Sequence, residues 1–414
     1  MIKITDKHNC CGCSACSQAC PKQCISFIED TEGFFYPKVD ESSCVDCGLC
    51  EHVCPILNQS KPISPKNVYA AQNKNEEELL QSSSGGVFIL LARKIINEGG
   101  VVFGAKFDDK WQVIHAFAEA EEDVKQFIGS KYVQSYLGST YQNVKTFLIS
   151  GRKVLFSGTP CQIAGLKKFL RKDYDDLLTV DIICHGVPSP AVWKKYLEEI
   201  KQNARKGKNT VSLHHNLSVS ERDTLEEDGG IEIESISFRD KKLGWQKFSF
   251  TLTLAEATAD GKKNSVSLSH IHKEDPYLRL FLSNLILRPS CYQCPVKGGK
   301  SHSDITLADF WGIENSHPEL DDKRGVGLLL INTLKGDSFI RPLNVSLYSV
   351  SLEEGIAGNS AYYKSVSEPK VRSKCFKLIS KNKELTELIR LIDYVPLHVR
   401  VKIKLKLLFS TLFK

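Results

Sequence analysis

One cysteine motif occurs twice in the first 54 residues of this chain, and it limits the possible folds more than any other feature. Ten of the 15 cysteines lie in this region. A segment this short buries too little apolar surface to be stable by itself. We therefore expect bound metal to supply much of its folding energy. Both copies of the motif read C-x2-C-x2-C-x3-C-P and lie 34 residues apart, at Cys10, Cys13, Cys16, Cys20 and at Cys44, Cys47, Cys50, Cys54.

The spacing of the repeat favours iron–sulfur clusters over zinc or disulfides. Three closely spaced thiolates bind three irons of one 4Fe–4S cubane, and the fourth binds the other cluster, as in two-cluster ferredoxins. Zinc sites typically have one set of four ligands with a longer spacer between C-x2-C pairs. Cys11 and Cys24 fall outside the register and are not expected to be ligands. We predict one cluster on Cys10, Cys13, Cys16 and Cys54, and a second on Cys44, Cys47, Cys50 and Cys20.

Length and composition exclude several classes of protein. The 414 residues are 42% hydrophobic and 25% charged, which is ordinary for a folded chain of two or three domains. No run of 18 apolar residues and no apolar signal core occur, so we predict a cytoplasmic protein. The net charge of +6 carries little weight, because thiolate-held clusters are anionic. Nucleic acid is therefore not an expected partner.

After residue 68 the pattern alternates between strands and helices. This alternation predicts an α/β body behind a small ferredoxin head, an α+β / α/β chain overall. Residues 203–234 are polar and poorly patterned, which indicates an exposed loop. Helices are expected at 84–97, 141–149, 161–172, 190–202 and 276–284, and strands at 101–107, 113–118, 153–157, 177–184, 235–238, 248–254, 304–310 and 327–333.

Four further cysteines lie far apart in the body. Cys161 stands where a predicted strand turns into a helix, and Cys184 ends the next strand. In an open parallel sheet these strand ends share one edge, where ligands bind. Together with the pair Cys291 and Cys294, these two thiols would complete a four-thiolate site. Free cysteines are also commonly buried for packing alone, and the spacing does not separate these readings.

Six segments of the body are informative together: GSKYVQS (129–135), FSGTPCQIAGLKKFL (156–170), DIICHGVPSP (181–190), SFRDKKLGW (237–245), CYQC (291–294) and SDITLADFWG (303–312). Together they resemble one known family, the beta subunits of coenzyme F420 (deazaflavin) hydrogenases and dehydrogenases. The resemblance spans about residues 68–335 and implies a flavoprotein that binds FAD beside a 4Fe–4S cluster. It also implies that Cys161, Cys184, Cys291 and Cys294 hold this third cluster.

The resemblance directs attention to three segments for the flavin. Glycine and hydroxyl residues at a helix start suit a phosphate or an electron-rich flavin edge. Lys131 is a candidate to stabilise an anionic flavin or a phosphate, and His185 is a candidate proton donor. A turn, an N-cap, a solvated lysine and a structural histidine bonded to backbone are the alternative interpretations. The candidates are Ser84, Gly85, Gly86, Ser130, Lys131, Tyr132, Gly158, Thr159, Pro160 and Gln162.

The predicted domain organisation has a head, a linker, a body and an extension. The head covers residues 1–59, the linker 60–67 and the two parts of the body 68–150 and 151–345. Residues 346–414 form a helical extension that ends in a basic tail. In 398–414 lysines alternate with apolar residues, which favours a terminal strand packed on the body or a peripheral membrane contact.

These observations support three functional hypotheses. The first is an iron–sulfur flavoprotein oxidoreductase that passes electrons through its clusters to or from FAD and a two-electron partner. The second is an electron-transfer subunit that docks on a catalytic partner. The third, suggested by the resemblance, is a reductase of polysaccharide biosynthesis. In each case a redox protein or a small electron carrier is the expected partner.

Overall fold

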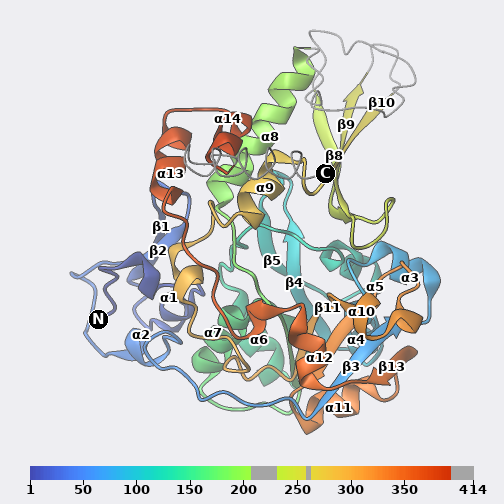
Figure 1. The fold of residues 1–414 in the computed structure, drawn as a ribbon. Coiled ribbons are helices and arrows are strands. Elements are labelled where there is room, and N and C mark those ends of the chain that lie inside the picture. The colour runs from blue at the N-terminus through green and yellow to red at the C-terminus, as the bar shows by residue number, and fades with distance from the viewer. Residues whose placement is uncertain (207–230, 258–262, 393–414) are drawn as a thin grey trace, which may run out of the picture.

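The computed structural model describes residues 1–206, 231–257 and 263–392. A small N-terminal head lies beside a larger body, and the C-terminal helices lie next to the head (Figure 1). The body contains an eight-stranded sheet and a separate three-stranded sheet. The predicted mixed α/β class is confirmed.

The head consists of two short helices and a hairpin. Each cysteine loop turns into its helix through a residue with left-handed backbone, Ser14 (φ 61°) in the first copy and Gly48 (φ 69°) in the second. The two residues occupy equivalent positions of the repeat, so its two halves share one backbone conformation. The elements are η1 (Lys7–Asn9), α1 (Ala15–Ala19), β1 (Ile25–Glu29), β2 (Phe35–Val39) and α2 (Leu49–His52), and β1 pairs antiparallel with β2.

The large sheet has the order β13-β3-β12-β11-β7-β6-β4-β5. Its four central strands β11, β7, β6 and β4 are parallel, and the outer strands are antiparallel to their neighbours. The two predicted parts of the body therefore contribute to one sheet. The strands are β3 (Asn67–Asn73), β4 (Val101–Phe107), β5 (Val113–Ala118), β6 (Val154–Ser157), β7 (Leu177–Ile182), β11 (Ile305–Asp309), β12 (Gly327–Ile331) and β13 (Val345–Ser349).

Both faces of this sheet are buried, each in its own core. Successive side chains of a strand point to opposite faces, so neighbouring residues enter different cores. Val102 and Leu155 pack into the core beneath α4, whereas Phe103 and Phe156 pack into the core of α6 and α7. The core of α6 and α7 also contains apolar residues of the head. The helices around the sheet are α3 (Glu76–Gln81), α4 (Val87–Asn97), α5 (Glu121–Val124), η2 (Lys125–Phe127), α6 (Thr140–Ile149), α7 (Pro160–Leu170) and α11 (Leu334–Ile340).

An aromatic core joins the three-stranded sheet to the helices α8 and α9. Trp193 lies against Phe238 and Tyr277, with ring centroids 5.0 and 5.1 Å apart. This region holds α8 (Pro190–Arg205), β8 (Glu232–Asp240), β9 (Ser249–Ala257), β10 (Lys263–Ile271), α9 (Pro276–Leu282) and η3 (Pro289–Gln293). The remaining elements are α10 (Ile313–Ser316), η4 (Pro318–Leu320), α12 (Leu352–Ala357), η5 (Ser360–Tyr362), α13 (Arg372–Ser380), α14 (Leu385–Leu388) and η6 (Ile389–Leu391).

Most predicted elements are confirmed, with differences at their ends. The strands at 101–107 and 113–118 have the predicted bounds. The predicted loop 203–234 was too long, because α8 continues to Arg205 and β8 begins at Glu232. The extension is not entirely helical, since β13 forms an edge strand at its start. The hairpin of the head, β3 and β10 were not predicted. The basic tail 398–414 lies outside the described residues.

No helix in the described part of the chain is both long enough and apolar enough to cross a lipid bilayer.

Candidate functional site

The eight repeated cysteines form two crossed groups. Burial and the negative charges of Cys10 and Cys54 raise the pKa of Cys16, so Cys54 of the second copy lies beside the first. Cys20 of the first copy lines a small cavity together with Cys44, Cys47 and Cys50. This is the exchange of the fourth cysteine that the spacing predicts. Their role as cluster ligands stays a prediction.

The two cysteines outside the register lie next to these sites. The Cys24 sulfur is 3.4 Å from that of Cys20, and Cys24 lines the same cavity as the second group. Cys11 is buried and lines the cavity of the body cysteines. That neither residue is a ligand stays a prediction, and the sequence gave no indication that either would lie in the wall of a thiol-lined cavity.

The four body cysteines converge on one cavity. Cys161 is in the first turn of α7, and Cys184 follows β7, the parallel neighbour of the strand that precedes α7. Cys291 lies in η3 and Cys294 caps it. Burial and the neighbouring thiols Cys161 and Cys294 raise the pKa of Cys184 to about 12. All four line the cavity, which distinguishes them from cysteines buried singly for packing.

A much larger cavity of about 640 Å³ lies beside the carboxyl ends of the central strands. Its volume is in the range of cavities that bind cofactors and small molecules. Nine of the ten predicted flavin contacts line it. The exception is Pro160, which lines the cysteine cavity instead. The nine are Ser84, Gly85, Gly86, Ser130, Lys131, Tyr132, Gly158, Thr159 and Gln162.

Two of the three predicted segments differ in how much hydrogen-bonding capacity they leave free. Gly158–Pro160 offers less than expected, because the amide of Thr159 donates to the Gln162 side chain at 2.8 Å and forms a capping box. In contrast, α4 begins after Gly86 (φ 72°) without any side-chain cap. Orphan amides at a helix start attract anions. The start of α4 therefore fits a phosphate better than the start of α7.

Lys131, the candidate for anion stabilisation, and His185, the candidate proton donor, both lie in the cavity wall. The Lys131 ammonium donates to the carbonyls of Ile128 and Gly129, and burial lowers its pKa to about 7. The His185 ring is 2.7 Å from the Asn284 side-chain oxygen, and burial lowers its pKa. The alternative interpretation of His185 was a structural histidine hydrogen-bonded to backbone. The observed contact is instead to the side chain of Asn284.

The sequence interpretation missed a buried ion pair in the cavity wall. Arg239 from β8 binds Asp309 at the end of β11 at 2.6 Å, and both line the cavity. The Arg239 Nε is buried without a hydrogen-bond partner. The strand-end rule that selected Cys184 also applies to Asp309, since β7 and β11 are parallel neighbours. A partner from another sheet has no comparable local signal.

The two cavities share one wall. The segment that follows β7 contributes to both, from Ile182 through Cys184 and His185 to Val187. A group held by the cysteines and a group held in the large cavity would thus be separated by one stretch of backbone. Electron transfer requires this kind of proximity between redox centres.

The fold and these sites define an iron–sulfur redox protein. Residues 9–57 match the family model described as 4Fe-4S dicluster domain. Residues 151–348 match the model for the C terminus of the beta subunit of coenzyme F420 hydrogenase/dehydrogenase. The chain thus combines a 4Fe–4S dicluster domain with a domain that belongs to the coenzyme F420 hydrogenase/dehydrogenase beta-subunit family. Neither description mentions FAD or polysaccharide biosynthesis, so both stay predictions.

The chain is similar to a curated protein and, more distantly, to a chain of known structure. An uncharacterized protein of Methanocaldococcus jannaschii is 28% identical over 206 aligned residues, covering 42% of this chain. The alignment spans only 56% of that relative's length. A chain of the F420-reducing [NiFe] hydrogenase complex from Methanosarcina barkeri aligns with 72% of this chain and 91% of its own at 15% identity, with a TM-score of 0.41.

Proposed function

We propose that this protein is an iron–sulfur flavoprotein oxidoreductase. In this proposal the repeated cysteines of the head hold two 4Fe–4S clusters, Cys161, Cys184, Cys291 and Cys294 hold a third, and the large cavity holds FAD. Clusters carry single electrons, and a flavin exchanges them for two-electron chemistry on a substrate.

The observation that carries the proposal is the wall shared by the two cavities, residues 182–187. A chain of thiol-lined sites from the head to the body supports an electron path. The large cavity at its end supports a place for the two-electron reaction. The donor set fits the clusters, because soft thiolates are the ligands that iron–sulfur clusters require.

The cavity residues have separate roles in this proposal. The uncapped start of α4 and the Lys131 ammonium bind anionic groups of the cofactor. The Arg239 guanidinium, with one free donor, is available to an acceptor on the cofactor or the substrate. His185 lies between the cavities and holds or supplies a proton at its ring nitrogens. Trp311 and Phe281 exclude water from the wall.

Anaerobic reconstitution with iron, sulfide and FAD tests the proposal. Three clusters require about twelve irons per chain, together with flavin released on denaturation. The match to a family named for coenzyme F420 makes this deazaflavin the first two-electron partner to assay. A reconstituted chain without flavin under any condition contradicts the oxidoreductase assignment and leaves an electron carrier.

An electron-transfer subunit without substrate chemistry is the second candidate. The family description as a beta subunit favours it. Turnover of a two-electron acceptor by the isolated chain with a chemical reductant would contradict this alternative. Flavin binding without turnover, restored by an added catalytic partner, would support it.

A further inference from the structure

Arg288 is a fully buried arginine at the boundary between head and body. Its exposed fraction is 0%, and it precedes η3 by one residue. Its Nε donates to the carbonyl of Cys10 at 2.7 Å, and its Nη1 donates to the Gln134 side chain at 3.0 Å. Its Nη2 donates to the carbonyl of Phe35 at 3.0 Å and contacts the Cys10 sulfur at 3.5 Å.

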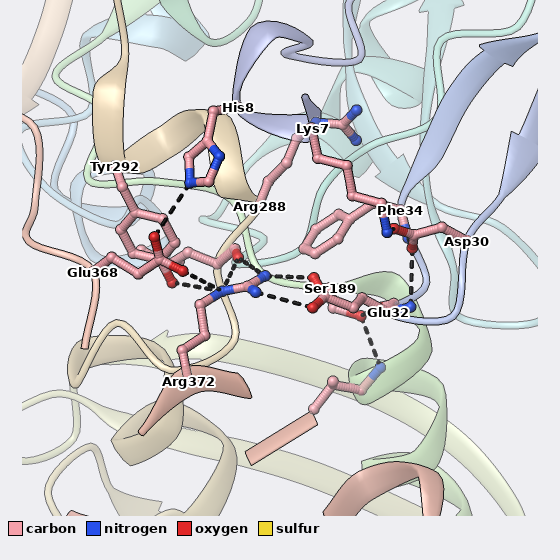
Figure 2. A network of polar contacts seen from close by, with 12 residues as sticks. Lys7, His8, Asp30, Glu32, Phe34, Ser189, Arg288, Tyr292, Glu368 and Arg372 are labelled. Atoms are coloured by element: carbon pink, nitrogen blue, oxygen red, sulfur yellow. Dashed lines mark hydrogen bonds and ion pairs between the residues drawn. The ribbon is translucent and has the colours of Figure 1, made fainter. Parts of the chain in front are cut away.

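This guanidinium differs from the other buried arginines in having no carboxylate partner. Arg239 pairs with Asp309 and Arg372 with Glu32, at 2.6 and 2.5 Å. Figure 2 shows the pair of Arg372 and Glu32 close to Arg288. Among the described residues no carboxylate lies within ion-pair distance of Arg288, and the ring of Tyr36 faces it at 4.2 Å. An uncompensated buried charge is costly, so a counter-charge is expected at this place.

The thiolates of the head supply such a counter-charge once they hold a cluster. Cys10 is the first cysteine of the repeat, and its sulfur already contacts the guanidinium. A 4Fe–4S cluster with its thiolates is anionic. Its reduction adds another negative charge, which a fixed cation in a water-poor environment stabilises. An N–H donor to the ligand sulfur acts in the same direction.

We propose that Arg288 is the fixed counter-charge of the head cluster held by Cys10, Cys13, Cys16 and Cys54, and that it raises the reduction potential of this cluster. The inference rests on the head ligands of the proposed function. This cluster, here called the inner cluster, is the one that lies against the body, because Cys13 packs on Gly165 of α7. Arg288 thus favours an electron on the inner cluster, which is the head cluster nearest to the body cysteines.

The local packing holds the guanidinium in this position. Gly12 lies between Cys11 and Cys13 with φ 71°, and a Cβ there would be 2.9 Å from Nη1 of Arg288. Glycine therefore makes room for the arginine at the cysteine loop. From Arg288 the chain continues through Pro289 and Ser290 to Cys291 of the body site. Arg288 therefore contacts a ligand of the inner cluster and also stands three positions before a cysteine of the body site.

Redox titration of the intact reconstituted protein, followed by electron paramagnetic resonance, tests the proposal. Arg288→Gln should lower the equilibrium constant for reduction of the inner cluster at least tenfold, which is 59 mV for one electron. Arg288→Lys keeps the positive charge and should lower this equilibrium constant less than Arg288→Gln does. The second head cluster, held by Cys20, Cys44, Cys47 and Cys50, is the internal control. Cys47→Ser alters that cluster and Cys161→Ser alters the proposed body cluster, so the signal that both variants retain belongs to the inner cluster.

The double variant Glu32→Gln/Arg372→Gln is the matched control, because it removes one charge of each sign from the same interface. This double variant should change the equilibrium constant for reduction of the inner cluster by less than threefold. An unchanged potential in Arg288→Gln, or an equal change in both head clusters, would overturn the proposal. Failure of the proposed function would instead appear in the unaltered protein, as missing flavin or missing third-cluster iron.

A measurement without substitution covers the case in which Arg288→Gln loses its head iron. In the unaltered protein labelled with ¹⁵N-guanidino arginine, electron–nuclear double resonance should detect coupling of ¹⁵N to the unpaired electron of the reduced inner cluster. The second head cluster should have none. Absence of coupling at the inner cluster would then overturn the proposal.

Discussion

At the residue scale, burial determines the properties of the side chains that line the two cavities. The thiols of the body site are held in a water-poor environment, where burial raises the pKa of Cys184 to about 12. A buried thiol without a partner is neutral and unreactive. Metal binding is what converts these groups to thiolates. The body cysteines therefore depend on their cluster for the charge that our proposal assigns to them.

Cys161→Ser tests the third cluster at this scale. Because a serine hydroxyl is a poor ligand for iron, we expect bound iron to fall from about twelve to about eight per chain. The absorption and resonance signals of the head should not change. Cys375→Ser is the matched control, since Cys375 is buried in α13 and lines none of these cavities, and it should keep all the iron. Equal iron in Cys161→Ser and the unaltered chain would show that the ligand assignment is wrong.

Lys131 gives the large cavity a predicted dependence on pH. With a pKa of about 7 in the free protein, Lys131 is cationic below this pH and neutral above it. An anionic cofactor favours the charged form, so binding above pH 7 takes up a proton. Affinity for FAD should therefore fall as pH rises from 7 to 9.

Fluorescence titration of FAD at several pH values measures this effect. Lys131→Met should bind FAD more weakly at pH 6 and lose the dependence above pH 7. Lys106→Met is the control, because Lys106 of β4 is paired with Gln126 outside the cavity wall, and its profile should match the unaltered protein. A flat profile in the unaltered protein would contradict the prediction.

At the element scale, one ion pair connects the two sheets. Arg239 comes from β8 and Asp309 from the end of β11, and the guanidinium also lies over the Phe248 ring at 4.3 Å. The side chain of Arg239 is only 3% exposed. Loss of one partner of a buried pair leaves the other charge uncompensated.

Asp309→Asn should therefore lower the free energy of unfolding by about 3 kcal/mol. Glu122→Gln is the control, because it removes the exposed pair with Lys125, and such pairs contribute at most about 1 kcal/mol. Chemical denaturation of the two variants measures the difference. Equal stability losses would mean that the pair between the sheets is not effectively buried.

At the scale of the whole molecule, the head and the body share a core. Cys13, Ala15 and Val53 of the head pack with Tyr141 and Leu166 of the body. The polar network of Figure 2 adds contacts from Arg372 of α13 to Glu32 and from His8 to Glu368. The head is therefore held against α6 and α7 by apolar contacts, and against the C-terminal segment around α13 by polar and ionic contacts. This docking fixes the position of the inner cluster relative to the body cysteines.

Gly165→Ala tests this docking. A Cβ at residue 165 would lie 2.9 Å from the Cβ and 3.0 Å from the sulfur of Cys13, which the proposed inner cluster would hold in place. In an unconstrained helix this substitution would stabilise by roughly 0.5–1 kcal/mol. Here we expect a lower melting temperature and an altered signal of the inner cluster. Lys168→Ala on the same helix should change neither, and a stabilised Gly165→Ala protein would contradict the docked arrangement.

The features that the sequence predicts correctly are local. The spacing of the thiols in each copy of the repeat depends on a few consecutive residues, and two such copies are the known pattern in which the fourth thiol of each joins the other group. Buried strands such as β4 and β6 have continuous apolar runs, and Pro190 begins α8 as expected at a first turn. Chain order also places Cys161 and Cys184 at neighbouring strand ends, because β6 and β7 are consecutive and parallel.

Contacts between distant parts of the chain were decided only by the tertiary structure. The sheet order brings β11 beside β7 and so positions Asp309 near Cys184, although 125 residues separate their sequence numbers. Arg288 meets Cys10, Arg239 meets Asp309, and Cys11 reaches the cavity of the body. None of these pairs has a signal in the local pattern, because each depends on how separate elements are packed. The sequence therefore predicts which groups bind metal, and the packing determines which charges and cavities surround them.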